Sequence, residues 1–330
     1  MSMDGGIQMP ATVTHAFFAK DVFDILPTDI REMCDVDRVK MFGQSVDSLM
    51  FYNLFSILPG KSIRKFDKEF HRTHTRDFFL NVLHFMRDHS IDDSDTYSFL
   101  IGFICHYVLD STLHPYVLYK TGYFQKGKRE TYKYNNIHDF METFIDNDMI
   151  RRRENTNPYF FNIGSYCFDL REFSTPLKQT IQYSFYNTFH RSQMDKIYYK
   201  SLKQMKRALM TFRRDPYGIK KFFYKLADTF TTNGCFRFEA ISYHYPLDDR
   251  HNFLNANHTL WRNPTTYDMT STESFVDLYL KSIKKAKVLI CASIDYIHGK
   301  DIDLESVFPD VSYLTGIDWN SNKEIKYFEF

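Results

Sequence analysis

The sequence predicts an all-α protein, with one α-helical domain spanning residues 1–330. Apolar residues recur every three or four positions in several long segments, the spacing that places them on one face of a helix. The chain contains only 12 Gly and 10 Pro, which argues against an all-β protein with many turns. No Pro-, Gly- or Ser-rich linker divides the chain, so a single domain is the simplest organisation.

Helices are expected in a defined order along this domain. The first follows an N-cap at Thr12 or Thr14 and ends before Pro27, and another follows an N-cap at Thr75. Further helices are expected at 98–119, 136–153, 173–190, 192–213, 216–232 and 273–297. We expect a metal-binding core at 10–190, additional helices and a His- and Asn-rich loop at 191–300, and a tail at 301–330. The loop, at 240–268, has a length that is commonly functional.

The helix expected at 98–119 is largely apolar but has three polar residues on one face. His106, Asp110 and His114 are four residues apart, which is about one helical turn. Buried imidazoles and carboxylates are costly unless they are paired or bind a metal. Gly102, one turn before His106, leaves room above it. The apolar run is too short to span a bilayer. A core helix with satisfied histidines is the alternative, but a stripe of three residues favours a site.

Other candidates lie before and after this helix. His138 and Glu142 repeat the four-residue spacing on the helix expected at 136–153. His15 lies in the first turn of the first helix, where a histidine is often a surface or capping residue. Asp47 precedes an aromatic, apolar run, where a carboxylate can simply interact with the helix dipole.

The candidate donors together suit a zinc site with more than one ion. The full set is His15, Asp47, His71 or His74, His106, Asp110, His114, His138 and Glu142. Nitrogen and oxygen donors with several histidines suit zinc better than magnesium or calcium, and they are too many for one tetrahedral ion. Multinuclear sites bind phosphoryl oxygens and lower the pKa of a shared water, so the residues indicate hydrolysis of a phosphodiester or phosphomonoester.

Charge and cysteine content restrict the remaining functions. The net charge of +1, from 42 basic and 41 acidic residues, gives no electrostatic case for a nucleic-acid partner. Five scattered cysteines without a C-x-x-C pair indicate neither a disulfide framework nor a cysteine zinc site. The first residues lack the pattern of a signal peptide, and no segment is expected to span a membrane, so we expect a cytoplasmic protein. The Lys/Arg-rich stretch at 197–225 is interpreted as the solvent-exposed face of amphipathic helices. Peripheral contact with a membrane surface is the second interpretation.

The motifs resemble the zinc-dependent phospholipase C family. They are T-H-A-F-F-A at 14–19, G-x-x-x-D at 43–47, H-Y-V-L-D-S-T-L-H-P-Y at 106–116 and H-D-F-M-E at 138–142. The resemblance covers about residues 10–190, and segments between 255 and 280 are similar to small bacterial members without a signal peptide. It implies a multi-helix fold shared with single-strand-specific zinc nucleases, and hydrolysis of a phospholipid, of the phosphatidylcholine type, by metal-activated water.

The resemblance also implies which residues hold zinc. The implied ligands of the first zinc are Asp47, His106 and His71, with His74 as a less favoured alternative to His71. Asp110 would bridge this ion to a second zinc, which His15 also binds. The implied ligands of the third zinc are His114, His138 and Glu142. Asp47 would also act as the general base.

Two departures from the family's secreted members keep alternatives open. Those enzymes use an N-terminal tryptophan beside the equivalent of His15, whereas no Trp lies near the start of this sequence. The step from Asp110 to His114 is also shorter, so a site with two ions is an alternative to one with three. A non-catalytic metal-binding or interaction protein that retains the fold is one alternative function. A nuclease-like phosphodiesterase is another, which the near-neutral charge disfavours. Zinc content and phospholipid hydrolysis would separate these functions.

Overall fold

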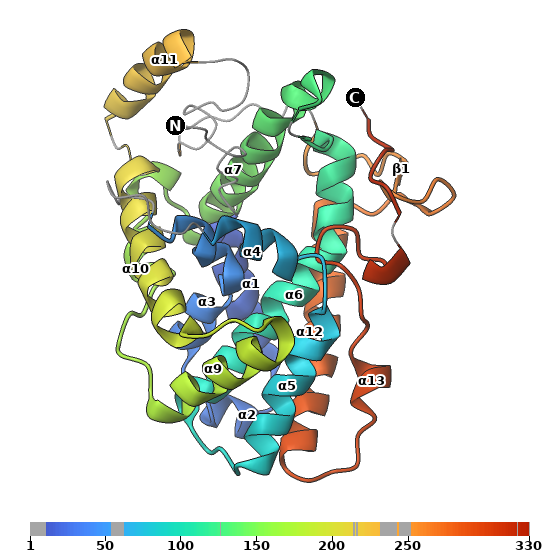
Figure 1. Ribbon diagram of the computed structural model, residues 1–330. Helices are drawn as coiled ribbons and strands as arrows, with labels where there is room; N and C mark the ends of the chain where they lie inside the picture. The colour runs from blue at the N-terminus through green and yellow to red at the C-terminus, as the bar shows by residue number, and fades with distance from the viewer. Residues whose placement is uncertain are drawn as a thin grey trace.

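The structure is a computed structural model that describes residues 11–53, 63–125, 127–213, 215, 217–231, 243, 252–321 and 323–329. It consists almost entirely of helices (Figure 1), which confirms the predicted all-α class. The helices are α1 (Thr12–Ile25), α2 (Thr28–Glu32), α3 (Val36–Phe42), η1 (Ser45–Phe51), α4 (Arg64–Phe70), α5 (Thr75–Asp88), α6 (Ser94–Thr121), η2 (Arg129–Thr131), α7 (Tyr132–Glu154), η3 (Pro158–Phe160), α8 (Ile163–Tyr166), α9 (Thr175–Phe189), α10 (Met194–Phe212), α11 (Ile219–Thr231), α12 (Phe275–Ile297), α13 (Leu304–Val307) and η5 (Trp319–Ser321). Within the described residues, the only paired strands are the antiparallel β1 (Trp261–Arg262) and β2 (Thr270–Ser271).

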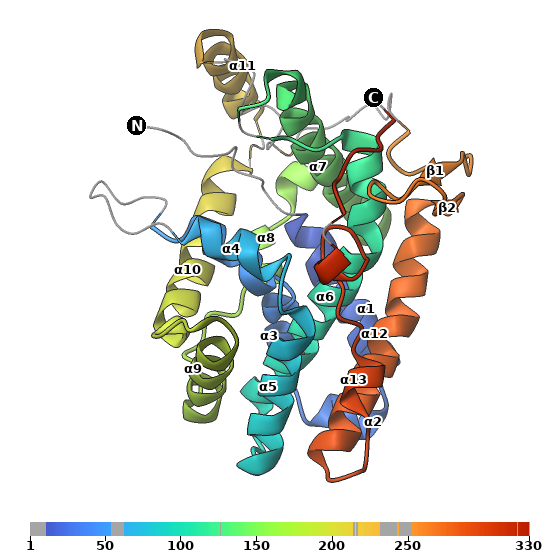
Figure 2. The ribbon, with the colours of Figure 1, turned by 45° about the vertical axis from the view of Figure 1, so that its right-hand side comes forward.

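Helix α6 lies at the centre of the bundle and is longer than predicted. It begins at Ser94, because the Asp93 carboxylate accepts a hydrogen bond from the Thr96 backbone N–H (2.9 Å) and so caps the helix. It packs against α1, α3, α7, α9 and α12, and its middle is buried throughout (Figures 1 and 2). The polar residues on α6 are therefore held within the core, as the apolar surroundings predict.

Glycine 102 allows α3 to approach α6 closely. A Cβ atom at Gly102 would lie 2.6 Å from Phe42 Cβ and 2.8 Å from the Gly43 backbone nitrogen. The room that Gly102 leaves is therefore occupied by the end of α3. This contact places the Gly43 carbonyl beside His106, one turn further along α6.

The predicted cap of α1 is wrong, because a carboxylate from α7 takes its place. Ala11 occupies the N-cap position without a side-chain bond. The Asp146 carboxylate instead accepts hydrogen bonds from the backbone N–H groups of Val13 (3.3 Å) and Thr14 (2.8 Å). Asp146 also pairs with the buried Arg213 (3.0 Å). This buried network fixes the first turn of α1, which carries His15.

The predicted cap of α5 is also wrong. His74, not Thr75, occupies the N-cap position, and its side chain forms no capping bond. Asp310, in the C-terminal part of the chain, accepts hydrogen bonds from the Thr75 hydroxyl (3.0 Å) and the Arg76 N–H (3.1 Å). The start of α5 is thus held by a segment more than 230 residues away.

The later helices lie within a few residues of their predicted positions, and the long loop differs from its prediction. Much of the loop predicted at 240–268 lies outside the described residues, and from Asn252 onward it contains β1. Helix α11 projects from the bundle in both ribbon views (Figures 1 and 2). In the described part of the chain, no helix is long and apolar enough to cross a membrane.

Candidate metal centre

Several elements bring the predicted donor residues together inside the bundle. They lie on α1 (His15), η1 (Asp47), the residue after α4 (His71), α6 (His106, Asp110 and His114) and α7 (His138 and Glu142). All are buried except His114, whose side chain is 15 % exposed. Groups of three that place their donor atoms within 4.8 Å of one another are His15–Asp47–His106, His71–His106–Asp110, His114–His138–Glu142 and Asp47–Asp67–His71.

Asp110 lies at the centre of this cluster. Its Oδ1 atom is 3.3 Å from His15 Nε2, and its Oδ2 atom is 3.2 Å from His106 Nε2. The same Oδ2 atom lies 3.6 Å from His114 Nδ1 and 3.8 Å from His71 Nε2. One carboxylate therefore faces imidazoles from three segments of the chain.

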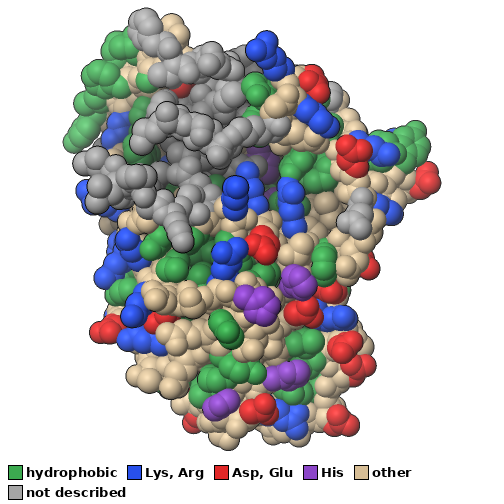
Figure 3. Space-filling model, in the orientation of Figure 1, with side chains coloured by type: hydrophobic (Ala, Val, Ile, Leu, Met, Phe, Trp, Pro, Cys, Tyr) green, Lys and Arg blue, Asp and Glu red, His purple; other side chains and the backbone are tan. Residues whose placement is uncertain are grey.

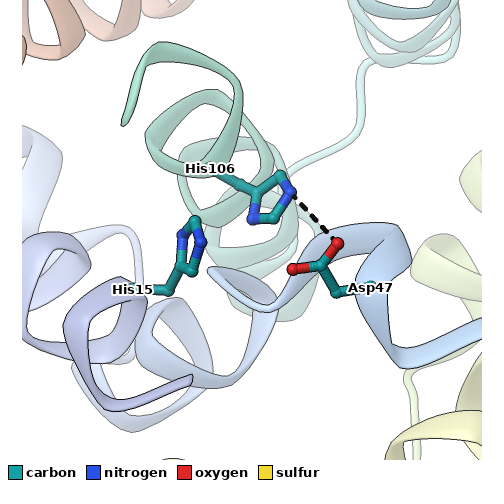
Figure 4. Close-up of side chains that lie close together, drawn as sticks. All are labelled: His15, Asp47 and His106. Atoms are coloured by element: carbon teal, nitrogen blue, oxygen red, sulfur yellow. Dashed lines mark ion pairs between the residues drawn. The ribbon is translucent and has the colours of Figure 1, made fainter. Parts of the chain in front are cut away.

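Asp47 faces two of the same histidines. Its Oδ1 atom lies 3.1 Å from His71 Nε2 and 3.8 Å from His106 Nε2. Figure 4 shows Asp47 pointing toward His106, with His15 beside it; the two imidazole rings stack at 4.4 Å between centroids. The Nε2 atoms of His71 and His106 are 3.5 Å apart.

A second group lies at the α7 end of the cluster. Glu142 Oε1 is 3.2 Å from His138 Nε2 and 3.9 Å from His114 Nε2. The Thr121 hydroxyl donates to the Val117 carbonyl (2.8 Å), so its oxygen can accept from His138 Nδ1 at 3.4 Å. His114 therefore lies between the two groups.

Backbone carbonyls determine the tautomers of three histidines. The Nδ1 atoms of His106, His71 and His114 face the carbonyl oxygens of Gly43 (3.0 Å), Asp67 (2.9 Å) and Tyr313 (3.2 Å). Each Nδ1 must donate, because a carbonyl oxygen only accepts. The lone pair of a neutral ring is then on Nε2, the arrangement that is typical of metal-binding histidines.

These lone pairs face carboxylate oxygens, so a cation is needed between them. For His71 with Asp47 and His106 with Asp110, two acceptors 3.1 and 3.2 Å apart repel unless a proton or a metal ion lies between them. Ligands held about 2.1 Å from a tetrahedral zinc are separated by about 3.4 Å. In addition, Asp110 Oδ2 and Glu142 Oε2 are buried without a hydrogen-bond partner among the described residues. The donor set therefore fits zinc.

The electrostatics show how strongly these groups interact. Burial lowers the pKa of His71, but the Asp67 and Asp47 carboxylates outweigh it and raise that pKa to about 10. His114 follows the same pattern, with its pKa raised to about 9 by Asp110 and Glu142. By contrast, burial and the charge of His106 lower the pKa of His15 to about 4. Burial raises the pKa of Asp110, but the surrounding imidazoles, His106 first, hold it well below its usual range.

Two residues differ from the predicted donor set. His74 does not join the cluster: its side chain is 45 % exposed and pairs with Asp77 (3.0 Å) on the surface. Asp67, which was not predicted, lies 3.5 Å from His71 Nδ1 and is buried. Its signal in the sequence is the four-residue spacing to His71, the same spacing that identified the other pairs.

A comparison with protein families agrees with this geometry. Residues 14–156 match the family model described as zinc-dependent phospholipase C. Over these residues the chain is similar to the zinc-dependent phospholipase C family. The matched segment contains every donor residue of the cluster, from His15 to Glu142. No curated protein and no solved structure matches the chain.

Proposed function

We propose that the protein is a zinc-dependent hydrolase that cleaves a phosphodiester bond of a phospholipid, of the phosphatidylcholine type, by metal-activated water. The pairs of His71 Nε2 with Asp47 and of His106 Nε2 with Asp110 carry this proposal, because they need a cation between them and zinc suits their spacing. The family, described as a phospholipase C, supports a phospholipid substrate. Zinc in such a site polarises phosphoryl oxygens and lowers the pKa of a water molecule.

We propose that the cluster holds two or three zinc ions. The proposed ligands are His71, His106 and Asp47 for one ion, His15 and the bridging Asp110 for a second, and His114, His138 and Glu142 for a third. In this scheme, Asp47 accepts the proton of the attacking water. The buried carbonyls of Gly43 and Tyr313 hold His106 and His114 in the required tautomers.

Zinc content and turnover together test the proposal. Metal-free protein is loaded with zinc, desalted and assayed for bound zinc and for hydrolysis of a short-chain phosphatidylcholine and of single-stranded DNA. We expect two or three zinc ions and hydrolysis of the lipid alone. Asp47→Asn should reduce turnover by at least about 100-fold while most zinc is retained. Fewer than two bound zinc ions together with no turnover would contradict the proposed enzymatic function. Cleavage of DNA alone would favour the nuclease-like alternative.

We also propose that α11 contacts the surface of the lipid substrate. Ile219, Phe222, Phe223 and Leu226 fall on one side of this helix and are 45–66 % exposed (Figure 3). Lysines are interspersed among them in the sequence, a combination that is typical of helices lying in a membrane interface.

Vesicle binding tests this contact. Changing Phe222 and Phe223 together to Ser should reduce sedimentation of the protein with phosphatidylcholine vesicles containing an anionic lipid. Hydrolysis of a soluble short-chain lipid should stay unchanged. Val288→Ser, at a residue that is 63 % exposed on α12, is the matched control. Equal sedimentation of the two variants would show that α11 is not the contact.

A further inference from the structure

We propose that the C-terminal segment Pro309–Gly316, here named the strap, is part of the metal centre and positions two of its ligands, His71 and His114. The strap lies far along the chain from the family-matched residues 14–156. In Figure 2, the C-terminal part of the chain passes in front of α6, which carries His114. The inference rests on the proposed zinc site and adds a positioning element to it.

Tyr313 contacts both ligands through its backbone. Its N–H donates to the His71 carbonyl (3.0 Å), and its carbonyl accepts from His114 Nδ1 (3.2 Å). The Ser312 hydroxyl donates to the same His71 carbonyl (3.2 Å). His71, which follows α4, and His114, which lies on α6, are therefore both hydrogen-bonded to the backbone of the same residue.

The Tyr313 ring fills the space behind these ligands. It is fully buried, and its centroid lies 5.2 Å from the His71 ring and 5.8 Å from the His106 ring. Phe70 and Tyr107 enclose it from other sides, at 5.9 and 5.0 Å. The ring therefore limits rotation of the two imidazoles by packing.

Both ends of the strap are anchored. At one end, Asp310 caps α5 through Thr75 and Arg76. At the other, the Asn263 side chain donates to the Thr315 carbonyl (2.9 Å). Gly316 itself lies so close to α6 that a Cβ atom would be 2.4 Å from the Ser111 carbonyl oxygen. Since Ser111 follows Asp110, a change at Gly316 displaces the strap beside the centre of the cluster.

Groups that hydrogen-bond to metal ligands orient them, and the loss of such a group typically lowers metal affinity 10- to 100-fold. Without the strap, His114 loses the acceptor that keeps its proton on Nδ1, and the His71 carbonyl loses two donors. Weaker binding of zinc and a change in ligand geometry are therefore expected when the strap is displaced.

The Gly316→Ala variant tests this, with Gly299→Ala as the matched control. Both glycines have positive φ (63° and 89°), so both substitutions strain the backbone, but a Cβ atom at Gly299 has nothing within 4 Å. Each full-length, metal-free variant is titrated with zinc against a competing chelator, and with cobalt while its visible absorption is recorded. We expect Gly316→Ala to bind its weakest ion at least about 10-fold less tightly, with an altered cobalt spectrum. Gly299→Ala should match the unaltered protein.

Two milder variants keep the test decisive if Gly316→Ala does not fold. Ser312→Ala removes one donor to the His71 carbonyl and should weaken zinc binding in the same direction by a smaller factor. Tyr313→Phe keeps the ring and both backbone bonds, and should retain the zinc affinity and the cobalt spectrum. Unaltered affinity and spectrum in both Gly316→Ala and Ser312→Ala would overturn the role of the strap while leaving the proposed function intact. If the unaltered protein itself bound no zinc, the proposed function would fail, and the strap's role with it.

Discussion

Asp110 links the parts of the cluster at the scale of single residues. Its two oxygens face His15 on α1 and His106 on its own helix, at 3.3 and 3.2 Å. A carboxylate in this position can bridge two ions, whereas a histidine serves only one. The four-residue spacing on α6 was sufficient to predict this stripe, because residues one turn apart share a helical face.

Single residues also mark the limit of prediction from the sequence. His71 and His74 are both close to the start of α5 and could not be separated by pattern. They differ in the structure because His71 ends α4 facing the core, whereas His74 turns outward in a left-handed conformation (φ 54°). Asp67 escaped prediction because the preceding residues, 56–66, carry no apolar pattern that indicates a helix.

This pair of histidines supplies a matched test. We expect His71→Ala to lose at least one zinc ion, because its Nε2 atom lies 3.1 Å from Asp47 and 3.5 Å from His106 Nε2. His74→Ala should keep the zinc content of the unaltered protein, because the His74 side chain is 45 % exposed and its Nδ1 atom pairs with Asp77, outside the cluster. Zinc per chain is measured by mass spectrometry after dialysis. A loss of zinc in His74→Ala alone would reverse the assignment.

At the scale of elements, long apolar periodicity predicted helices well, but not their caps. The caps of α1 and α5 come from Asp146 and Asp310, each distant in sequence from the helix it holds. Local sequence cannot reveal such partners, since they depend on how the helices pack. The strap could not be predicted from the sequence either, because it contacts His71 and His114 largely through backbone atoms that every residue possesses.

The close approach of α3 to α6 predicts an unusual response to Gly102→Ala. In an exposed helix interior, this substitution stabilises by up to about 1 kcal/mol. Here the new Cβ atom would meet Phe42 at 2.6 Å, so we expect destabilisation by about 1–3 kcal/mol, measured by equilibrium urea unfolding. Gly164→Ala is the control, because the atoms nearest to its Cβ atom belong to the flexible side chains of Met210 and Lys206. Equal stability changes in both variants would contradict the tight contact.

At the scale of the whole molecule, the cluster joins segments from residue 15 to residue 142, and the strap adds residues 309–316. Four buried imidazoles, the largely buried His114 and several carboxylates share one region of the core, which is costly without a cation. Metal binding should therefore be coupled to the protonation of the entire cluster.

Proton release on zinc binding tests this coupling. In the metal-free protein, the pKa values of His71 and His114 are raised to about 10 and about 9, so both rings are protonated at pH 7. A zinc ligand must be neutral at Nε2, so binding expels these protons. Calorimetry in two buffers with different ionisation enthalpies should show release of at least one proton. Heats that are independent of the buffer would contradict a protonated metal-free cluster.

The most direct test of the metal centre is anomalous X-ray diffraction at the zinc edge, from crystals of the zinc-loaded full-length protein. We expect two or three anomalous peaks, with at least one between Asp110 and the Nε2 atoms of His15 or His106, and one beside Glu142 and His138. Anomalous peaks that all lie outside this cluster, or no peak in a zinc-loaded crystal, would contradict the proposed zinc centre.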